Sequence, residues 1–405
     1  TNGAVVGTIN YFSATVTFTT AVSNTGGAVT ADYDHFNYAR NYVQLGNGGS
    51  GATANDGHGG DISVVAGLGG IEGDITFNAG VSSDAYAQLG QGGNVAVGDH
   101  FGDIRVDALG DIRFTGEFNL RAYTQLGNGG YNSDLNTTNA NNPWGVNSAA
   151  IGNRGDILVN TRTNLLTNRG GIFFTAGGGE ESSAQLGHGG FANRGVNSGT
   201  ILDVRAAGDI VFLSGDGSGR GDDTGASRFG DGRRSFAHLG HGGYDADTHN
   251  VAADATDGLG HFSDIMVMSG GTIRFIATDI VSDPTGAVAG PIANDFRNYV
   301  HLGHGGYASN GDHRGNLTVV AGTGIEFRSG GVQASATANT SQDNYAQLGH
   351  GGYTSSGYGG NDTNAFTGDI AVLSRAGDIR FLAGNATDSY VQLGHGGRGA
   401  NEGAI

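Results

Sequence analysis

The chain contains no cysteine, three prolines and one tryptophan among its 405 residues. Without cysteine the fold cannot depend on disulfide bonds, and cysteine usage leaves the cellular compartment open. A collagen triple helix is excluded, because proline is scarce and glycine follows no three-residue period. No apolar run approaches the roughly 20 residues that cross a bilayer as a helix, so no membrane span is expected.

Lysine is also absent, so arginine supplies all 20 cationic side chains, against 38 acidic ones. The resulting net charge is −18. An acidic, lysine-free surface argues against nucleic acids and anionic membranes as partners, since both carry negative charge.

Glycine is abundant instead, with 79 residues, and much of it lies in a repeated motif that we call QLGxGG. The motif occurs eight times, with Gln or His at its first position. Its leucines are Leu45, Leu89, Leu126, Leu186, Leu239, Leu302, Leu348 and Leu393.

Two further motifs alternate with it in a fixed order. The GDI motif (Gly-Asp-Ile-x-Val) places an aliphatic residue at Ile62, Ile104, Ile157, Leu202, Ile265, Leu317 and Ile370. The Ile-x-Phe motif ends at Phe77, Phe114, Phe174, Phe212, Phe275, Phe327 and Phe381, and Val16-x-Phe18 is interpreted as its opening copy.

Each motif alternates apolar and variable residues, the pattern of a strand that is buried on one side. The shortest unit has 8 residues from Ile104 to Ile112, 14 from Ile112 to Leu126 and 15 from Leu89 to Ile104, which together make 37. Longer units place their extra residues in the arcs between motifs, as stacked coils tolerate. A propeller is the alternative, but its blades need four strands.

The sequence therefore predicts an all-β parallel β-solenoid (β-helix), with three short strands per coil and about eight coils joined by arcs of variable length. Residues 1–405 form a single repeat array in this interpretation. Its units lie near 1–49, 60–93, 102–130, 155–190, 200–243, 263–306, 315–352 and 368–397, and the next unit begins at the C-terminus. Equivalent strands would lie about 4.8 Å apart, with the phenylalanines in one internal stack.

Because the array stops within a unit, we expect either part of a longer chain or subunits that stack end to end.

Histidine is the most suggestive candidate for chemistry. Five histidines share the variable position of QLGxGG: His188, His241, His304, His350 and His395. Earlier units place Asn47, Gln91 and Asn128 there. Stacked imidazoles could bind Zn²⁺ or Cu²⁺, or sense pH. Because Asn, Gln and His all donate and accept hydrogen bonds, a side-chain ladder is the favoured interpretation, and no metal site is predicted.

The residue two positions before the Gln or His is aromatic in seven of the eight copies. If the leucines point inward, these aromatic residues form an outer Tyr/Gln ladder and a possible interaction surface. Its tyrosines are Tyr42, Tyr86, Tyr123, Tyr299, Tyr345 and Tyr390. Arg220, Gly221 and Asp222 form an RGD tripeptide in a long arc, which is a second possible contact site.

No cofactor is predicted, and calcium is left open. Asp in glycine-rich turns offers the oxygen ligands that calcium prefers. However, the calcium-binding repeat GGxGxDxUx is not reproduced in register.

The glycine- and Asp-rich strand repeats resemble the β-helical shafts of giant bacterial surface exoproteins of the filamentous-haemagglutinin and adhesin type. The resemblance covers the entire chain and rests on repeat style and composition. It implies secretion, a rod at the cell surface and a role in adhesion or biofilm, with no catalytic residue.

We therefore expect a structural extracellular fibre or adhesin shaft that self-associates into filaments, end to end or laterally. Extracellular polysaccharide or a host or cell surface is a further possible partner. A polysaccharide-binding or polysaccharide-active β-helix protein is the alternative. An enzyme of that kind needs carboxylates grouped once on a groove, whereas the polar residues here recur from unit to unit, so no catalytic site is predicted.

Overall fold

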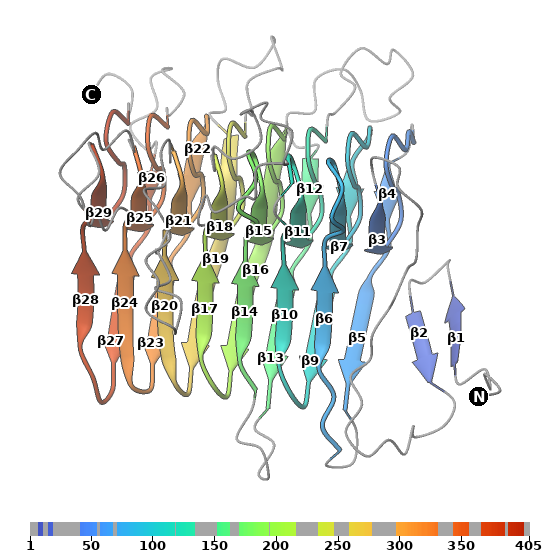
Figure 1. The fold of residues 1–405 in the computed structure, drawn as a ribbon, viewed down its shortest axis with the longest axis horizontal. Helices are drawn as coiled ribbons and strands as arrows, with labels where there is room; N and C mark the ends of the chain where they lie inside the picture. The colour runs from blue at the N-terminus through green and yellow to red at the C-terminus, as the bar shows by residue number, and fades with distance from the viewer. Residues whose placement is uncertain are drawn as a thin grey trace, which may run out of the picture.

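The computed structural model describes residues 7–10, 15–18, 41–54, 57–67, 71–117, 119–133, 152–162, 170–193, 195–215, 234–246, 259–277, 297–330, 343–355, 366–384 and 388–400. Within these residues the chain contains only β-structure, arranged in three sheets. Figure 1 shows the strands of each sheet side by side along the long axis of the molecule, in the order of the chain. This is the predicted parallel β-solenoid with three strands per coil.

Each motif supplies one sheet. Sheet A holds the GDI strands: β5 (Ile62–Ala66), β9 (Ile104–Ala108), β13 (Ile157–Thr161), β16 (Val196–Ala206), β19 (Leu259–Ser269), β23 (Leu317–Ala321) and β27 (Ile370–Ser374). Sheet B holds the Ile-x-Phe strands: β6 (Ile75–Asn78), β10 (Ile112–Thr115), β14 (Ile172–Thr175), β17 (Ile210–Leu213), β20 (Thr272–Ile276), β24 (Gly324–Arg328) and β28 (Ile379–Leu382). Sheet C holds the QLGxGG strands: β3 (Tyr42–Leu45), β7 (Tyr86–Leu89), β11 (Tyr123–Leu126), β15 (Ser183–Leu186), β18 (Phe236–Leu239), β21 (Tyr299–Leu302), β25 (Tyr345–Leu348) and β29 (Tyr390–Leu393).

A row of short strands precedes the GDI strands in sheet A: β4 (His58–Gly59), β8 (His100–Phe101), β12 (Gly152–Arg154), β22 (Asp312–Arg314) and β26 (Phe366–Thr367). A glycine separates each short strand from its GDI strand, for example Gly155 with φ of 142° between β12 and β13. Because such a φ favours glycine, this residue makes the corner. In β16 and β19 the two segments instead run on as single strands of 11 residues.

Neighbouring coils pair identical motif positions. In sheet B, Ile112 lies beside Ile172 and Phe114 beside Phe174. Since side chains alternate across a strand, this register puts every Ile and Phe of the motif on the same face. That face meets the inner faces of sheets A and C in one continuous core.

The phenylalanines form the predicted internal stack. Phe77, Phe114, Phe174, Phe212, Phe275, Phe327 and Phe381 follow one another with ring centroids 4.7–5.3 Å apart. Phe275 is fully buried between Phe212 and Phe327. The separation matches the distance between hydrogen-bonded strands, so one ring per coil fills the core without gaps.

The three glycines of QLGxGG are explained by close backbone stacking. At Gly303, with φ of 146°, an added Cβ would lie 2.0 Å from the carbonyl oxygen of Gly349 in the next coil. At Gly306 it would lie 2.2 Å from the carbonyl oxygen of Gly243 and 2.9 Å from the hydroxyl of Tyr299. A side chain at either position would therefore separate the coils.

The first strands correct one detail of the sequence interpretation. Strands β1 (Gly7–Asn10) and β2 (Thr15–Phe18) form an antiparallel hairpin, and β2 contacts β5 of sheet A through Thr15 and Ser63. Val16-x-Phe18 is thus not an opening copy of the Ile-x-Phe motif in sheet B. The hairpin lies beside the first coil in Figure 1.

Candidate functional site

The predicted outer Tyr/Gln ladder is wrong in its orientation. Tyr86, Tyr299 and Tyr345 are 0% exposed, Tyr123 is 3% exposed, and Gln88, Gln125, Gln185 and Gln347 are also buried. The segment that follows each QLGxGG strand folds back over this face, so that Gly306 packs against the hydroxyl of Tyr299. Only Tyr42, in the first coil, is well exposed at 41%, while Tyr390, in the last coil, is half-buried. A row buried in this way cannot present a continuous contact surface.

A second aromatic row covers the first. The residue after the two final glycines of the motif is aromatic in five coils. The ring centroids of successive residues in this row lie 4.7–5.1 Å apart, and its members are Tyr131, Phe191, Tyr244, Tyr307 and Tyr353. Sequence reasoning missed this row, although its fixed position after the glycine pair was a usable signal. Arginines flank it, with the Arg297 guanidinium 5.5 Å from the ring centre of Tyr307 and Arg234 5.9 Å from Tyr244.

The histidine positions of QLGxGG form a hydrogen-bonded ladder. The ring Nδ1 of each histidine accepts a hydrogen bond from the backbone N–H of the equivalent residue in the preceding coil. For His304, the distance from the backbone nitrogen of His241 to Nδ1 is 3.0 Å. Nε2 lies 2.8 Å from a corner carbonyl oxygen, that of Gly155 for His188 and that of Ser263 for His304. Asn128 makes the same contacts with Oδ1 and Nδ2, which explains why Asn replaces His in earlier coils.

Burial keeps His188, His241, His304 and His350 neutral. Loss of hydration lowers the pKa of His188 to about 4 and that of His350 to about 3. The pKa values of His241 and His304 are also lowered by burial, with a further contribution from the neighbouring imidazoles. A neutral ring is what the ladder needs, because Nδ1 must keep its lone pair to accept the backbone N–H.

One rung of this ladder is incomplete. His241 is 0% exposed, yet its Nε2 has no hydrogen-bond partner among the described residues. The corresponding nitrogens of His188, His304, His350 and His395 each contact a corner carbonyl oxygen. The difference therefore lies in the corner of the β16 coil, which is the coil that His241 faces by register.

A second polar row lies against the glycines of QLGxGG and was also missed. Its members are His58, His100, Asn153, Asn197, His261 and His313, all buried. Each lies three residues before the Asp position of the GDI motif, except Asn197, which lies four residues before it. The rings of His261 and His313 stack 4.9 Å apart. Burial lowers the pKa of His261 and of His100 to about 3.

The Asp residues of the GDI motif bridge coils through the backbone. Asp61 Oδ1 accepts the N–H of Asp103 at 3.0 Å, and Asp103 Oδ1 accepts that of Asp156 at 2.9 Å. Asp264 does the same for Asn316, and Asn316 Oδ1 for Asp369. Because each contact needs a side-chain oxygen at this position, these hydrogen bonds explain why the motif carries Asp or Asn there. Within the described ranges, no group of three or more His, Asp or Glu side chains is placed to hold a metal ion.

Charged side chains occupy a corner of the coil with left-handed backbone. Arg121, Glu181, Arg234 and Asp343 have φ between 58° and 61°. Residues of opposite charge in neighbouring coils pair there, as in Arg234–Glu181 at 2.6 Å and Arg121–Asp84 at 3.2 Å. The RGD tripeptide at residues 220–222 lies outside the described residues.

The coil formed by β27, β28 and β29 exposes residues that are buried elsewhere. Leu393 is 51% exposed and Ile379 44%, whereas the equivalent Leu348 and Ile325 are 0% and 2% exposed. At the opposite end of sheet C, Tyr42 is exposed where Tyr86 is buried. The strands at these two ends, β3 and β29, have the same sequence, YVQL.

In the part of the chain that the structure describes, no helix is long and apolar enough to cross a membrane. Comparison with models of protein families, with curated proteins and with solved structures gives no match.

Proposed function

We propose that the chain is a structural shaft that self-associates end to end into filaments at the cell surface or in the extracellular space. Its role there would be mechanical, in adhesion or in a biofilm matrix. The extracellular location and the adhesive role rest on the resemblance to surface exoprotein shafts. The proposal includes no catalytic role.

The exposed apolar coil at one end carries the proposal of self-association. Burying Leu393 and Ile379 against another coil would be favourable, since apolar area removed from water contributes about 25 cal/mol per Å². Unpaired edge strands are also templates for another chain.

A second copy fits this end through sheet C, whose two outer strands match. The outer edge of β29 (YVQL) would pair with β3 (YVQL) of the next copy in the register that already joins β25 to β29. Sheet C has eight described strands and sheet B seven, so the strand pairing between copies would be made through sheet C. Such a head-to-tail contact does not close on itself, so it yields a filament.

Light scattering and electron microscopy of the 405-residue chain over a concentration series test this proposal. We expect rods that lengthen with concentration at constant width. Leu393→Lys should shorten them at least tenfold in mean length, because it places a charge on the contact. Val211→Lys, at a partly exposed side chain of β17, the central strand of sheet B, is the matched control and should leave length unchanged. A monomer that stays stable at every concentration would refute self-association.

A further inference from the structure

The regular stacking of sheet A is interrupted at one place. Among the described strand pairs, register shifts occur only between β16 and β19 and between β19 and β22. Ser198 pairs with Phe262 and Ile201 with Asp264, so β16 holds Gly199 and Thr200 opposite the single Ser263. This extra residue is a β-bulge, and bulges are enriched beside functional sites.

The interruption changes the corner between the two segments of sheet A. Gly155 and Gly315 make this corner with φ of 142° and 141°, while Ser263 takes the corresponding position in β19. Strands β16 and β19 therefore run straight through. The Nε2 of His241 faces this altered corner and has no hydrogen-bond partner among the described residues. A buried polar atom without a partner lowers the stability of the fold, and the regular corners avoid this loss by supplying a carbonyl oxygen.

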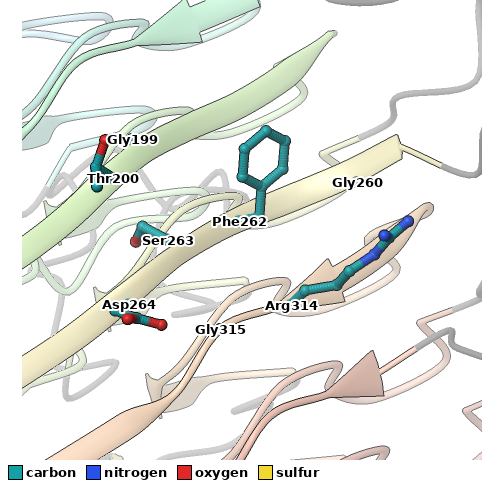
Figure 2. Close-up of a pocket in the computed structure, with 8 residues that line it drawn as sticks. All are labelled: Gly199, Thr200, Gly260, Phe262, Ser263, Asp264, Arg314 and Gly315. Carbon is teal, nitrogen blue, oxygen red and sulfur yellow. The ribbon is translucent and has the colours of Figure 1, made fainter.

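A cleft of about 370 Å³ opens over the interruption. Gly199, Gly260 and Gly315 line it without side chains, and Thr200, Phe262, Asp264 and Arg314 surround it. Figure 2 shows Phe262 and Arg314 projecting from neighbouring strands, with Asp264 two residues further along the strand of Phe262. The volume is at the low end of ligand pockets, which suits one or two small rings.

The side chains of the cleft match one class of ligand. Phe262 is 37% exposed, unusual for a phenylalanine in this shaft, and offers an open aromatic surface. The Asp264 carboxylate accepts hydrogen bonds, and the Arg314 guanidinium, whose side chain is 42% exposed, donates them. An aromatic surface beside an acceptor and a donor suits a pyranose ring, which has an apolar C–H face and adjacent hydroxyl groups.

The local charge selects among sugars. Arg314 already pairs with Asp312 at 3.2 Å, so Asp264 leaves the cleft with net negative charge. An anionic sugar would be repelled by this carboxylate. We propose that the cleft is a binding subsite for a sugar ring of a neutral polysaccharide.

Among the described coils, the other phenylalanine of this row does not offer the same surface. Phe101 occupies the equivalent row in β8, but the Arg154 guanidinium lies 5.4 Å from its ring centre. Its ring also covers Gly59, where an added Cβ would lie 2.1 Å from it. Among the described coils, the subsite therefore belongs to the β16–β19 interruption.

Saturation-transfer NMR tests the subsite with maltotriose, cellotriose and mannotriose as neutral probes and trigalacturonate as the anionic one. We expect transfer to the ring protons of at least one neutral probe at about 10 mM ligand, with weaker transfer to trigalacturonate. Phe262→Ala should lower affinity at least tenfold. Asp264→Asn should also lower it, and this variant should fold, because Asn316 Oδ1 makes the same backbone contact in the next coil.

Phe101→Ala is the matched control and should bind as the unaltered chain does. Leu393→Lys should also bind normally, which separates this subsite from filament formation. The proposal is overturned if no neutral probe binds, if trigalacturonate binds more tightly, or if Phe262→Ala and Phe101→Ala have equal effects.

Discussion

Each phenylalanine inside the shaft depends on the coils above and below it. Phe275 is fully buried between Phe212 and Phe327, at 4.8 and 4.9 Å. We expect Phe275→Ala to lower the free energy of unfolding by about 3–5 kcal/mol, because it leaves a cavity that neighbouring rings cannot fill. Denaturant unfolding measures this. Arg274→Ala, at the exposed position of the same strand, should cost less than about 0.5 kcal/mol. A loss below about 1 kcal/mol at Phe275 would contradict the internal stack.

The histidine ladder allows a second test at single residues. His304→Asn should fold normally, since Asn128 makes both ladder contacts elsewhere. It should also bind Zn²⁺ and Cu²⁺ no differently from the unaltered chain. His304→Leu should cost at least about 1–3 kcal/mol, because it leaves the N–H of His241 and the carbonyl oxygen of Ser263 without their partner. Thermal unfolding and metal titration of both variants check this. Stoichiometric metal binding that disappears when the five ladder histidines are replaced would favour a metal site instead.

At this scale the sequence predicts residue type better than orientation. The exchange of Asn, Gln and His at one position was sufficient to predict a hydrogen-bonded ladder. The burial of Tyr86 and Tyr345 was not predictable from alternation, because alternation assigns one face of a strand to the outside. The alternation within a strand carries no information about the segment that follows it. That segment folds back over the outer face and brings Tyr307 and Tyr353 against it.

At the scale of the strand and its turn, glycine determines how closely coils approach. Gly303→Ala should destabilise the protein by at least about 2 kcal/mol, because it combines a left-handed φ of 146° with a Cβ 2.0 Å from the backbone of the next coil. Gly324→Ala is the matched control, since its nearest neighbour would be 3.4 Å away and its φ is not positive. It should change stability by less than about 0.5 kcal/mol in the same melt. Equal effects at the two glycines would argue against close stacking as the reason for the motif.

The strands themselves were predictable because each motif carries the alternation of its sheet and repeats it in register. The interruption at β16 and β19 was not predicted. In the sequence it differs from a regular corner by Thr200, inserted after Gly199, by Ile201 in place of Asp, and by Ser263 in place of glycine. These changes do not show how neighbouring strands pair, so the cleft over them became evident only when the strands were placed side by side.

At the scale of the whole molecule, the buried histidines make stability depend on pH. Burial lowers the pKa of His188 and His238 to about 4 and that of His100, His261 and His350 to about 3, from an ordinary 6.5. The unfolded chain therefore binds protons at a higher pH than the folded chain does. The stability that these histidines contribute is complete above about pH 6.5 and is lost as the pH falls toward 4 and 3.

One carboxyl group acts in the opposite direction. Burial raises the pKa of Asp99 to about 6, so its contribution is present at low pH and is lost as the pH rises between about 4 and 6. A single group of this kind offsets about one histidine in that range. The histidines outnumber it, so the net effect of falling pH is destabilising.

We therefore expect the free energy of unfolding to fall steeply between pH 6.5 and about 4, by up to about 1.4 kcal/mol per pH unit for each buried histidine. Denaturant unfolding at pH 7.5, 6 and 5 measures this slope. His304→Asn removes one such group, so its slope should be shallower by about 1.4 kcal/mol per unit. Parallel slopes for the unaltered chain and His304→Asn would mean that His304 is not held neutral by the fold.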